Sequence, residues 1–174
     1  QFARLHREIH TASGDGLRPL PDLIEKKIDA FDPISDGGKS LLLSHLHRDG
    51  PRQLCHGDFH PENVILSPQQ HLRPIDWANA YQGDPLSDVA RTAYLIKHGL
   101  RPGLRAVAEE ERPLREQVIL GYCDEYFGDN PPEKTEWAAW QIIITINRYT
   151  EIDDEKPTIE KAIAEIQVDH PKLR

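Results

Sequence analysis

The chain of 174 residues contains no methionine and only two cysteines, Cys55 and Cys123. Two cysteines cannot supply the disulfide framework of a small secreted domain. No apolar run approaches the roughly 20 residues that a membrane-spanning helix needs, and the N-terminus lacks the features of a signal peptide. We therefore expect a cytoplasmic protein without a membrane partner.

The sequence also lacks an excess of basic residues. Lys and Arg number 21 against 29 Asp and Glu, which gives a formal net charge of -8. A nucleic-acid partner is excluded on this ground, because neutralising phosphates requires a basic face. Contents of 38% hydrophobic and 29% charged residues are typical of one globular domain of this length.

The missing initiator methionine coincides with a first segment, QFARLHREIH, that already has helical periodicity. Phe2, Leu5 and Ile9 recur at helical spacing and predict a helix over residues 2–12. We therefore expect the chain to be part of a longer polypeptide.

Most of the sequence has the periodicity and end signals of helices. Asp84 is a suitable N-cap, Pro85 falls at the first helical position, and Gly99 ends the pattern. The predicted helices cover residues 23–31, 41–48 (capped by Ser35 or Asp36), 84–98, 113–127, 133–149 and 158–168, with 133–149 central because it is apolar on most sides. The expected fold class is α+β and predominantly α-helical.

A short region between residues 52 and 76 has a different character. Short apolar runs at 52–56, 63–67 and 71–76 predict strands or hairpins. They flank the polar octet HGDFHPEN, residues 56–63, and we expect them to be buried. Loops held between such segments commonly carry positioned functional groups.

The octet allows two interpretations on its own. His56, Asp58 and His60 at alternate positions are candidate zinc ligands, although Pro61 stiffens the loop directly after them. Alternatively, the octet is a polar turn whose Asp and Asn satisfy backbone groups. The other paired histidines are interpreted as surface or half-buried side chains: His6, His10, His45 and His47.

The segment IDW at 75–77 favours a third interpretation. Asp76 lies thirteen residues beyond Asn63, and a hairpin between them would bring their side-chain oxygens together. Such oxygens suit Mg²⁺, which proteins hold with one or two ligands plus substrate phosphates. Asp58 would project from the same loop toward an attacking hydroxyl, an arrangement that phosphoryl transfer requires.

HGDFHPEN resembles the catalytic loop of the protein-kinase-like superfamily, where His-Arg-Asp is followed after four residues by Asn. IDW resembles that superfamily's Asp-Phe-Gly segment. Gly57 in place of Arg, Asp-Trp-Ala in place of Asp-Phe-Gly, and GDPLSDVA at 83–90 are similar to the aminoglycoside phosphotransferase and choline kinase family. The resemblance covers about residues 54–96.

This resemblance implies a role for each matching side chain. Asp58 would be the catalytic base, and Asn63 and Asp76 would bind Mg²⁺. His60 would contact the transferred phosphate.

Two further residues would support the catalytic loop. His56 would brace it from behind, and Asp88 would anchor its backbone. The alternative for Asp88 is that it is simply a favourable acid in the first turn of a helix.

The superfamily's N-terminal lobe supplies a glycine-rich loop, a lysine and a glutamate that hold ATP. None is identifiable here: GDG at 14–16 lacks flanking strands, and GGK at 37–39 is not a phosphate-binding loop. We therefore expect residues 1–174 to form a single domain, the C-terminal lobe of a kinase-like phosphotransferase, and the isolated chain to be nearly inactive.

The expected activity is transfer of the γ-phosphate of ATP or GTP to a hydroxyl of an aminoglycoside, amino alcohol or sugar. Residues 124–161 carry ten acids and four bases, which indicates either an amine-binding pocket or a solvated acidic face. The alternatives are a protein kinase, a non-catalytic binding module and a zinc hydrolase. Neither the acceptor nor the oligomeric state follows from the sequence.

Overall fold

A computed structural model describes residues 1–47, 49–50, 52–99, 107–151 and 156–174. This part of the chain forms seven α-helices and two small antiparallel sheets, which confirms the expected fold class. The helices are α1 Phe2–Ile9, α2 Leu20–Asp29, α3 Asp36–Leu46, α4 Pro85–His98, α5 Arg112–Phe127, α6 Lys134–Tyr149 and α7 Lys156–Asp169. The strands are β1 Gln53–Cys55, β2 Val64–Leu66, β3 Leu72–Pro74 and β4 Tyr81–Gly83.

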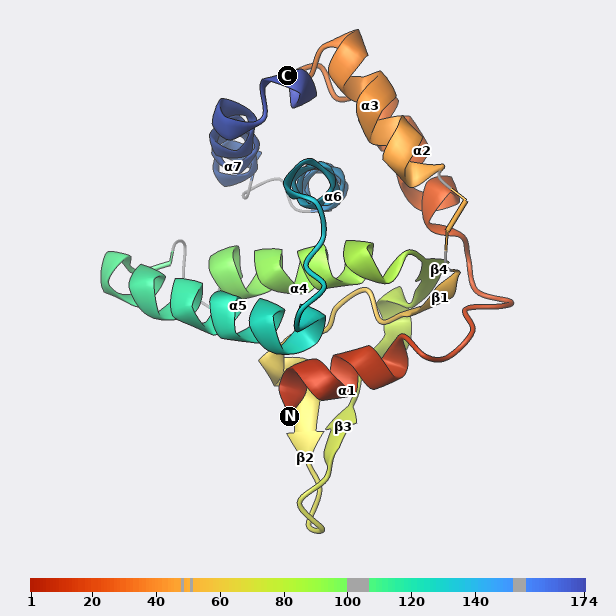
Figure 1. The fold of residues 1–174 in the computed structure, drawn as a ribbon, viewed down its shortest axis with the longest axis vertical. Helices are drawn as coiled ribbons and strands as arrows, with labels where there is room; N and C mark the ends of the chain where they lie inside the picture. The colour runs from red at the N-terminus through yellow and green to blue at the C-terminus, as the bar shows by residue number, and fades with distance from the viewer. Residues whose placement is uncertain (48, 51, 100–106, 152–155) are drawn as a thin grey trace.

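Helix α6 is the centre of the fold, as its all-round apolar character predicted. Helices α2, α3, α4 and α7 all pack against it (Figure 1). Its buried side chains are Ala138, Ala139, Trp140, Ile142, Ile143, Ile144, Thr145 and Ile146. Among the described residues, no helix combines the length and apolar character that crossing a membrane requires.

Helix α4 begins where the sequence predicts. The Asp84 side chain accepts a hydrogen bond from the Leu86 amide at 2.9 Å, and Pro85 opens the helix. Ser35 caps α3 in the same way by accepting from the Gly38 amide. Arg48, the predicted end of that helix, lies outside the described residues.

The strands pair partly as expected. Strands β2 and β3 form an antiparallel hairpin in which Val64 faces Pro74 and Leu66 faces Leu72. Strand β1 pairs instead with β4, a three-residue strand that the sequence did not predict. The two sheets together fix both ends of the loop that carries HGDFHPEN.

The expectation that both segments flanking this loop are buried is wrong for β2. Ile65 and Leu66 are 48% and 54% exposed, and Ile75 after β3 is 39% exposed. The cause is the placement of the β2–β3 hairpin, which projects away from the helical body (Figure 1). By contrast, Cys55 of β1 is fully buried.

Helix α1 packs against α5 and corrects the interpretation of two histidines. His6 and His10 are 0% and 6% exposed, whereas we expected surface or half-buried side chains. Their spacing of four residues places both on the helix face that lies against the protein. His45 is half-buried and His47 exposed, as predicted.

Candidate active site

The loop from His56 to Asn63 connects β1 to β2 and ends in a 3₁₀ turn, Pro61–Asn63. Gly57 has a φ of +78°, and a Cβ added there would lie 2.1 Å from the carbonyl oxygen of Asn79. A side chain at this position is therefore excluded by both conformation and space. This contact explains why an Arg between the histidine and the aspartate does not fit this chain.

The Asp58 side chain lies among three polar or charged side chains. The Asn63 Nδ2 group donates to the Asp58 backbone oxygen at 2.9 Å and to its Oδ2 at 3.1 Å. His60 Nε2 lies 3.6 Å from Oδ2, beyond hydrogen-bond length, and Arg91 Nη2 lies 3.8 Å from Oδ1.

These neighbours lower the pKa of Asp58. The His60 side chain contributes most, partial burial opposes it, and the Arg91 charge and the Asn63 amide add to the lowering. Asp58 is therefore ionised at neutral pH, and its side chain is 22% exposed, so that a ligand can reach it.

The hairpin brings Asn63 and Asp76 to the same end of β2 and β3. The Ile75 amide donates to the Asn63 carbonyl oxygen at 2.9 Å, so Asp76 is the next residue along from this bond. Asp76 has a φ of +61° in the left-handed region, a strained conformation for a residue other than glycine. Such strain clusters at functional sites.

The oxygens of this pair fit a hard cation. Among the described residues, no hydrogen bond or ion pair involves the exposed Asp76 carboxylate, and none uses Asn63 Oδ1. Both Asn63 donor contacts are made by Nδ2 toward Asp58, which leaves the amide oxygen as an acceptor. Carboxylate and amide oxygens are suitable ligands for Mg²⁺.

His56 lies behind the loop rather than in front of it. Its Nε2 contacts the Ile75 carbonyl oxygen at 3.0 Å, its Nδ1 accepts from the Asp58 amide at 3.3 Å, and its ring lies 4.4 Å from that of Trp77. Burial lowers the pKa of His56. Across the described ranges, His56, Asp58 and His60 do not form a ligand cluster, which corrects the zinc interpretation.

Asp88 of α4 holds the backbone of the loop. Its Oδ2 accepts from the His56 amide at 2.6 Å, and its Oδ1 accepts from the Gly57 amide at 3.0 Å. Asp88 is fully buried and accepts these hydrogen bonds. A favourable interaction with the first turn of α4 therefore does not by itself explain the acid at this position. The Asp88 carboxylate thus holds the backbone of Gly57, the residue that precedes Asp58.

Two histidine–tyrosine pairs converge on the same carboxylate, and the sequence did not predict them. His6 Nε2 and His10 Nε2 lie 3.0 and 3.2 Å from Asp88 Oδ2. Their Nδ1 atoms contact the Tyr122 and Tyr126 hydroxyls at 2.7 and 2.6 Å. The available signal was the spacing of His6 and His10, which places both on one helix face.

This buried cluster is a hydrogen-bonded network with a metal-like composition. His6, His10 and Asp88 offer ligand atoms within 4.8 Å of one another. However, burial lowers the pKa of His6 to about 4, and a neutral imidazole can donate from Nε2 while accepting from a tyrosine hydroxyl at Nδ1. All these polar groups are therefore satisfied without a cation.

Arg91 of α4 is a second residue that sequence reasoning missed. It is 5% exposed and contacts Glu151 through Nη1 and Nη2 at 3.4 and 3.2 Å. It lines a cavity of about 370 Å³ whose wall also includes Gly57 and Asn79. This cavity lies directly beside the loop that carries Asp58.

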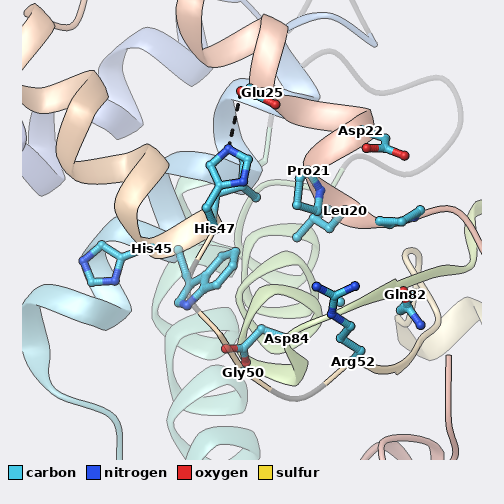
Figure 2. A pocket seen from close by; sticks show the side chains of 14 residues that line it. Leu20, Pro21, Asp22, Glu25, His45, His47, Gly50, Arg52, Gln82 and Asp84 are labelled. Carbon is cyan, nitrogen blue, oxygen red and sulfur yellow. Dashed lines mark ion pairs between the residues drawn. The ribbon is translucent and has the colours of Figure 1, made fainter. Parts of the chain in front are cut away.

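Another cavity, of about 330 Å³, lies away from this loop. Figure 2 shows it between α2, the end of α3 and the edge of β4, where His47 and Glu25 form an ion pair at 3.4 Å. Neither Asp58 nor Asn63 lines it. It is therefore separate from the residues discussed above.

Comparison with known proteins identifies the family of this chain. A family model described as the phosphotransferase enzyme family, APH, matches residues 2–133. The chain belongs to the phosphotransferase enzyme family. The match includes the catalytic loop, the β2–β3 hairpin and helix α4.

Solved structures agree with this family in their fold. The structure of LicA in complex with AMP has a TM-score of 0.59 at 20% sequence identity, and the match covers 97% of this chain and 61% of LicA. Choline kinase LicA from Streptococcus pneumoniae has a TM-score of 0.52 at 21% identity, with 97% and 62% covered. The chain therefore shares its fold with these proteins, and it spans about three fifths of their length.

A curated relative is similar over a shorter region. Acyl-CoA dehydrogenase family member 10 of Mus musculus is 33% identical over an aligned stretch of 91 residues, and the match covers 47% of this chain and 8% of the mouse protein.

Proposed function

We propose that this chain forms the catalytic half of a Mg²⁺-dependent phosphotransferase that moves the γ-phosphate of ATP or GTP to a hydroxyl of a small molecule. The observation that carries the proposal is the arrangement at the end of the hairpin. An ionised aspartate, Asp58, is hydrogen-bonded to Asn63, and Asp76 follows the residue that pairs with Asn63. Membership of the phosphotransferase enzyme family supports it.

In the proposed reaction, the acceptor hydroxyl oxygen forms a bond to the γ-phosphorus while the bond to the bridging β–γ oxygen breaks. The nucleoside diphosphate leaves with that oxygen. The hydroxyl proton passes to the Asp58 carboxylate and then to solvent. Because the pKa of Asp58 is lowered, this carboxylate is a weak base, and its main contribution is to orient the hydroxyl.

Asn63 and Asp76 would hold the metal through Oδ1 and a carboxylate oxygen. Bound there, Mg²⁺ would neutralise charge on the donor phosphates. His60, whose Nε2 lies 3.6 Å from Asp58 Oδ2, would contact the transferred phosphate.

The nucleotide would need further support from outside the chain. An N-terminal nucleotide-binding lobe, formed by other residues of the polypeptide, would supply this support. Ile65, Leu66 and Ile75 expose apolar side chains on the hairpin next to Asn63, and a nucleotide base or that lobe would cover them. The chain alone is then expected to bind nucleotide weakly and turn over negligibly.

The test is phosphate transfer from ATP and GTP by a polypeptide that contains this chain and its upstream reading frame. A panel of alcohols, amino alcohols and sugars would be assayed with and without Mg²⁺. Asp58→Asn is expected to lower kcat about 10²- to 10⁴-fold, because it removes the group that orients the hydroxyl and accepts its proton. The circular dichroism spectrum should be unchanged.

Three outcomes would contradict the proposal. These are near-normal turnover by Asp58→Asn, transfer that does not depend on Mg²⁺, and Mg²⁺–nucleotide binding without transfer to any acceptor. The last would favour a non-catalytic binding module. Exclusive transfer to protein hydroxyls would favour a protein kinase.

A further inference from the structure

We infer that the cavity beside the catalytic loop binds the acceptor through an anionic group, so that the preferred substrate is a hydroxyl compound carrying a carboxylate or a phosphate. This inference rests on the proposed function and specifies its substrate class. The cavity of about 370 Å³ is lined by Gly57 and by residues of α2, α4 and α6. Its size suits a small molecule.

The position of the cavity connects it to Asp58. Arg91 lines the cavity and lies 3.8 Å from Asp58 Oδ1. Gly57, the residue before Asp58, lines it as well. A molecule held there can present a hydroxyl to Asp58 while the rest of it contacts the helices.

The charges that line the cavity are mainly positive. They comprise three cations, Arg18, Lys27 and Arg91, and a single carboxylate, Glu151. Two of these cations act on the third: burial lowers the pKa of Lys27, Glu151 opposes this, and Arg91 and Arg18 lower it further. A bound anion would relieve this repulsion, whereas a bound ammonium would add to it.

The carboxylate of the cavity is already engaged. Glu151 contacts both terminal nitrogens of Arg91 and accepts from Asn147 Nδ2 at 3.0 Å. Lys27 Nζ donates to Asn147 Oδ1 at 2.8 Å. Because this partner is a neutral amide, the contact does not compensate the positive charge of Lys27. The buried Arg91 Nε has no hydrogen-bond partner within the described part of the chain.

The cavity therefore does not favour the amine-bearing acceptor suggested by the acidic segment 124–161. Asp124, Glu125, Asp129, Glu133 and Glu160 of that segment are exposed and do not line the cavity. Residues 153–155 lie outside the described residues. Most of the described acids of the segment thus form a solvated face, and only Glu151 reaches the cavity.

The experiment is a titration of the ¹⁵N-labelled chain followed by amide chemical shifts. Four compounds share a three-carbon skeleton and differ in charge: glycerate, glycerol 3-phosphate, glycerol and 2-amino-1,3-propanediol. We expect the two anions to shift Lys27, Gly57 and Ala80 at lower concentrations than the neutral triol or the amine. Glycerate and glycerol 3-phosphate distinguish a carboxylate site from a phosphate site.

Lys27→Gln and Lys26→Gln form the matched pair, because Lys26 is the exposed neighbour of Lys27 on α2 and does not line the cavity. Lys27→Gln should raise the Kd for the bound anion about threefold to tenfold. Lys26→Gln should change it less than twofold, on the order expected for an exposed charge. Arg18→Gln provides a second test in case Lys27→Gln alters the fold.

Equal or tighter binding of glycerol or of the amine would overturn the inference. So would the absence of shifts at these residues with both anions, or equal effects of Lys27→Gln and Lys26→Gln. The titration needs neither nucleotide nor turnover. Its failure would leave the phosphotransferase proposal standing, and loss of that proposal would leave an anion-binding cavity.

Discussion

The loop from His56 to Asn63 has two sides that differ in how completely their polar groups are paired. The front group comprises Asp58, His60, Asn63 and Asp76. The rear group comprises His6, His10, Asp88, Tyr122 and Tyr126. In the front group, charged partners of Asp58 lie at 3.6 and 3.8 Å and Asp76 is exposed. Contacts in the rear group lie between 2.6 and 3.2 Å and are buried, except for the part-buried contact between His10 and Tyr126.

The rear group makes the loop rigid, whereas the front group offers the side chains that would bind ligands. The rear group fixes the backbone of His56 and Gly57 with satisfied hydrogen bonds that require the Asp88 charge. The front group keeps oxygens available for ligands, which costs little because it is partly exposed to water. The hydrogen bonds of the rear group therefore fix the loop backbone. The front carboxylates can then stay without close partners while the loop keeps its conformation.

The largest effect on stability is expected on the rear side, with an acid that belongs to neither group as the control. Asp88→Asn is expected to lower the free energy of unfolding by at least about 3 kcal/mol, because an amide cannot accept from all four buried donors. Asp22→Asn, at an exposed acid in the first turn of α2, should cost below about 1 kcal/mol. Urea unfolding measures both, and equal losses would show that Asp88 is only a favourable first-turn acid.

The rear group should also make stability depend on pH. The pKa of His6 is about 4 in the fold against 6.5 ordinarily, so the unfolded chain binds the extra proton between these values. Stability should therefore fall as pH drops from 6.5 toward 4, by up to about 1.4 kcal/mol per pH unit from this group, and this contribution should vanish above 6.5.

His6→Gln removes that proton and should flatten the slope over the same range. Lys26→Gln is the control, because Lys26 is exposed on α2 and does not belong to the rear group. Urea unfolding at a series of pH values gives the slopes. An unchanged slope in His6→Gln would mean that His6 is not held neutral by burial.

The smallest stability effect is expected on the front. Asp58→Asn should change the free energy of unfolding by below about 1 kcal/mol, because its charged partners lie beyond hydrogen-bond length and the side chain is partly exposed. Thermal or urea unfolding would measure this. A loss as large as that of Asp88→Asn would remove the distinction between the two sides.

The front group could be predicted from the sequence because its residues lie close together along the chain. Asp58 and Asn63 share one octet, and Asp76 follows at the spacing of a short hairpin. The helix ends at Asp84 and Pro85 were predictable for the same reason, since capping depends on neighbouring residues.

The rear group depends on contacts between distant segments. His6 and Asp88 are 82 residues apart, and His6 and Tyr122 are 116 apart, so local patterns cannot pair them. Strand β4 was missed because its three residues, Tyr81–Gly83, are extended through pairing with distant segments, β1 and Pro19. Arg91 escaped notice because its partner Glu151 belongs to a segment 60 residues away.

Both sides offer metal ligands, so locating a divalent ion tests the account most directly. Mn²⁺ can replace Mg²⁺ in an oxygen site, and it broadens amide signals close to it. In the polypeptide that also contains the upstream reading frame, with ADP and substoichiometric Mn²⁺, the amides of Asp58, Asn63 and Asp76 should broaden more strongly than those of His6, His10 and Tyr122. Broadening centred on His6 and His10, or none at Asn63 and Asp76, would contradict the assignment of the front group as the metal and phosphate site.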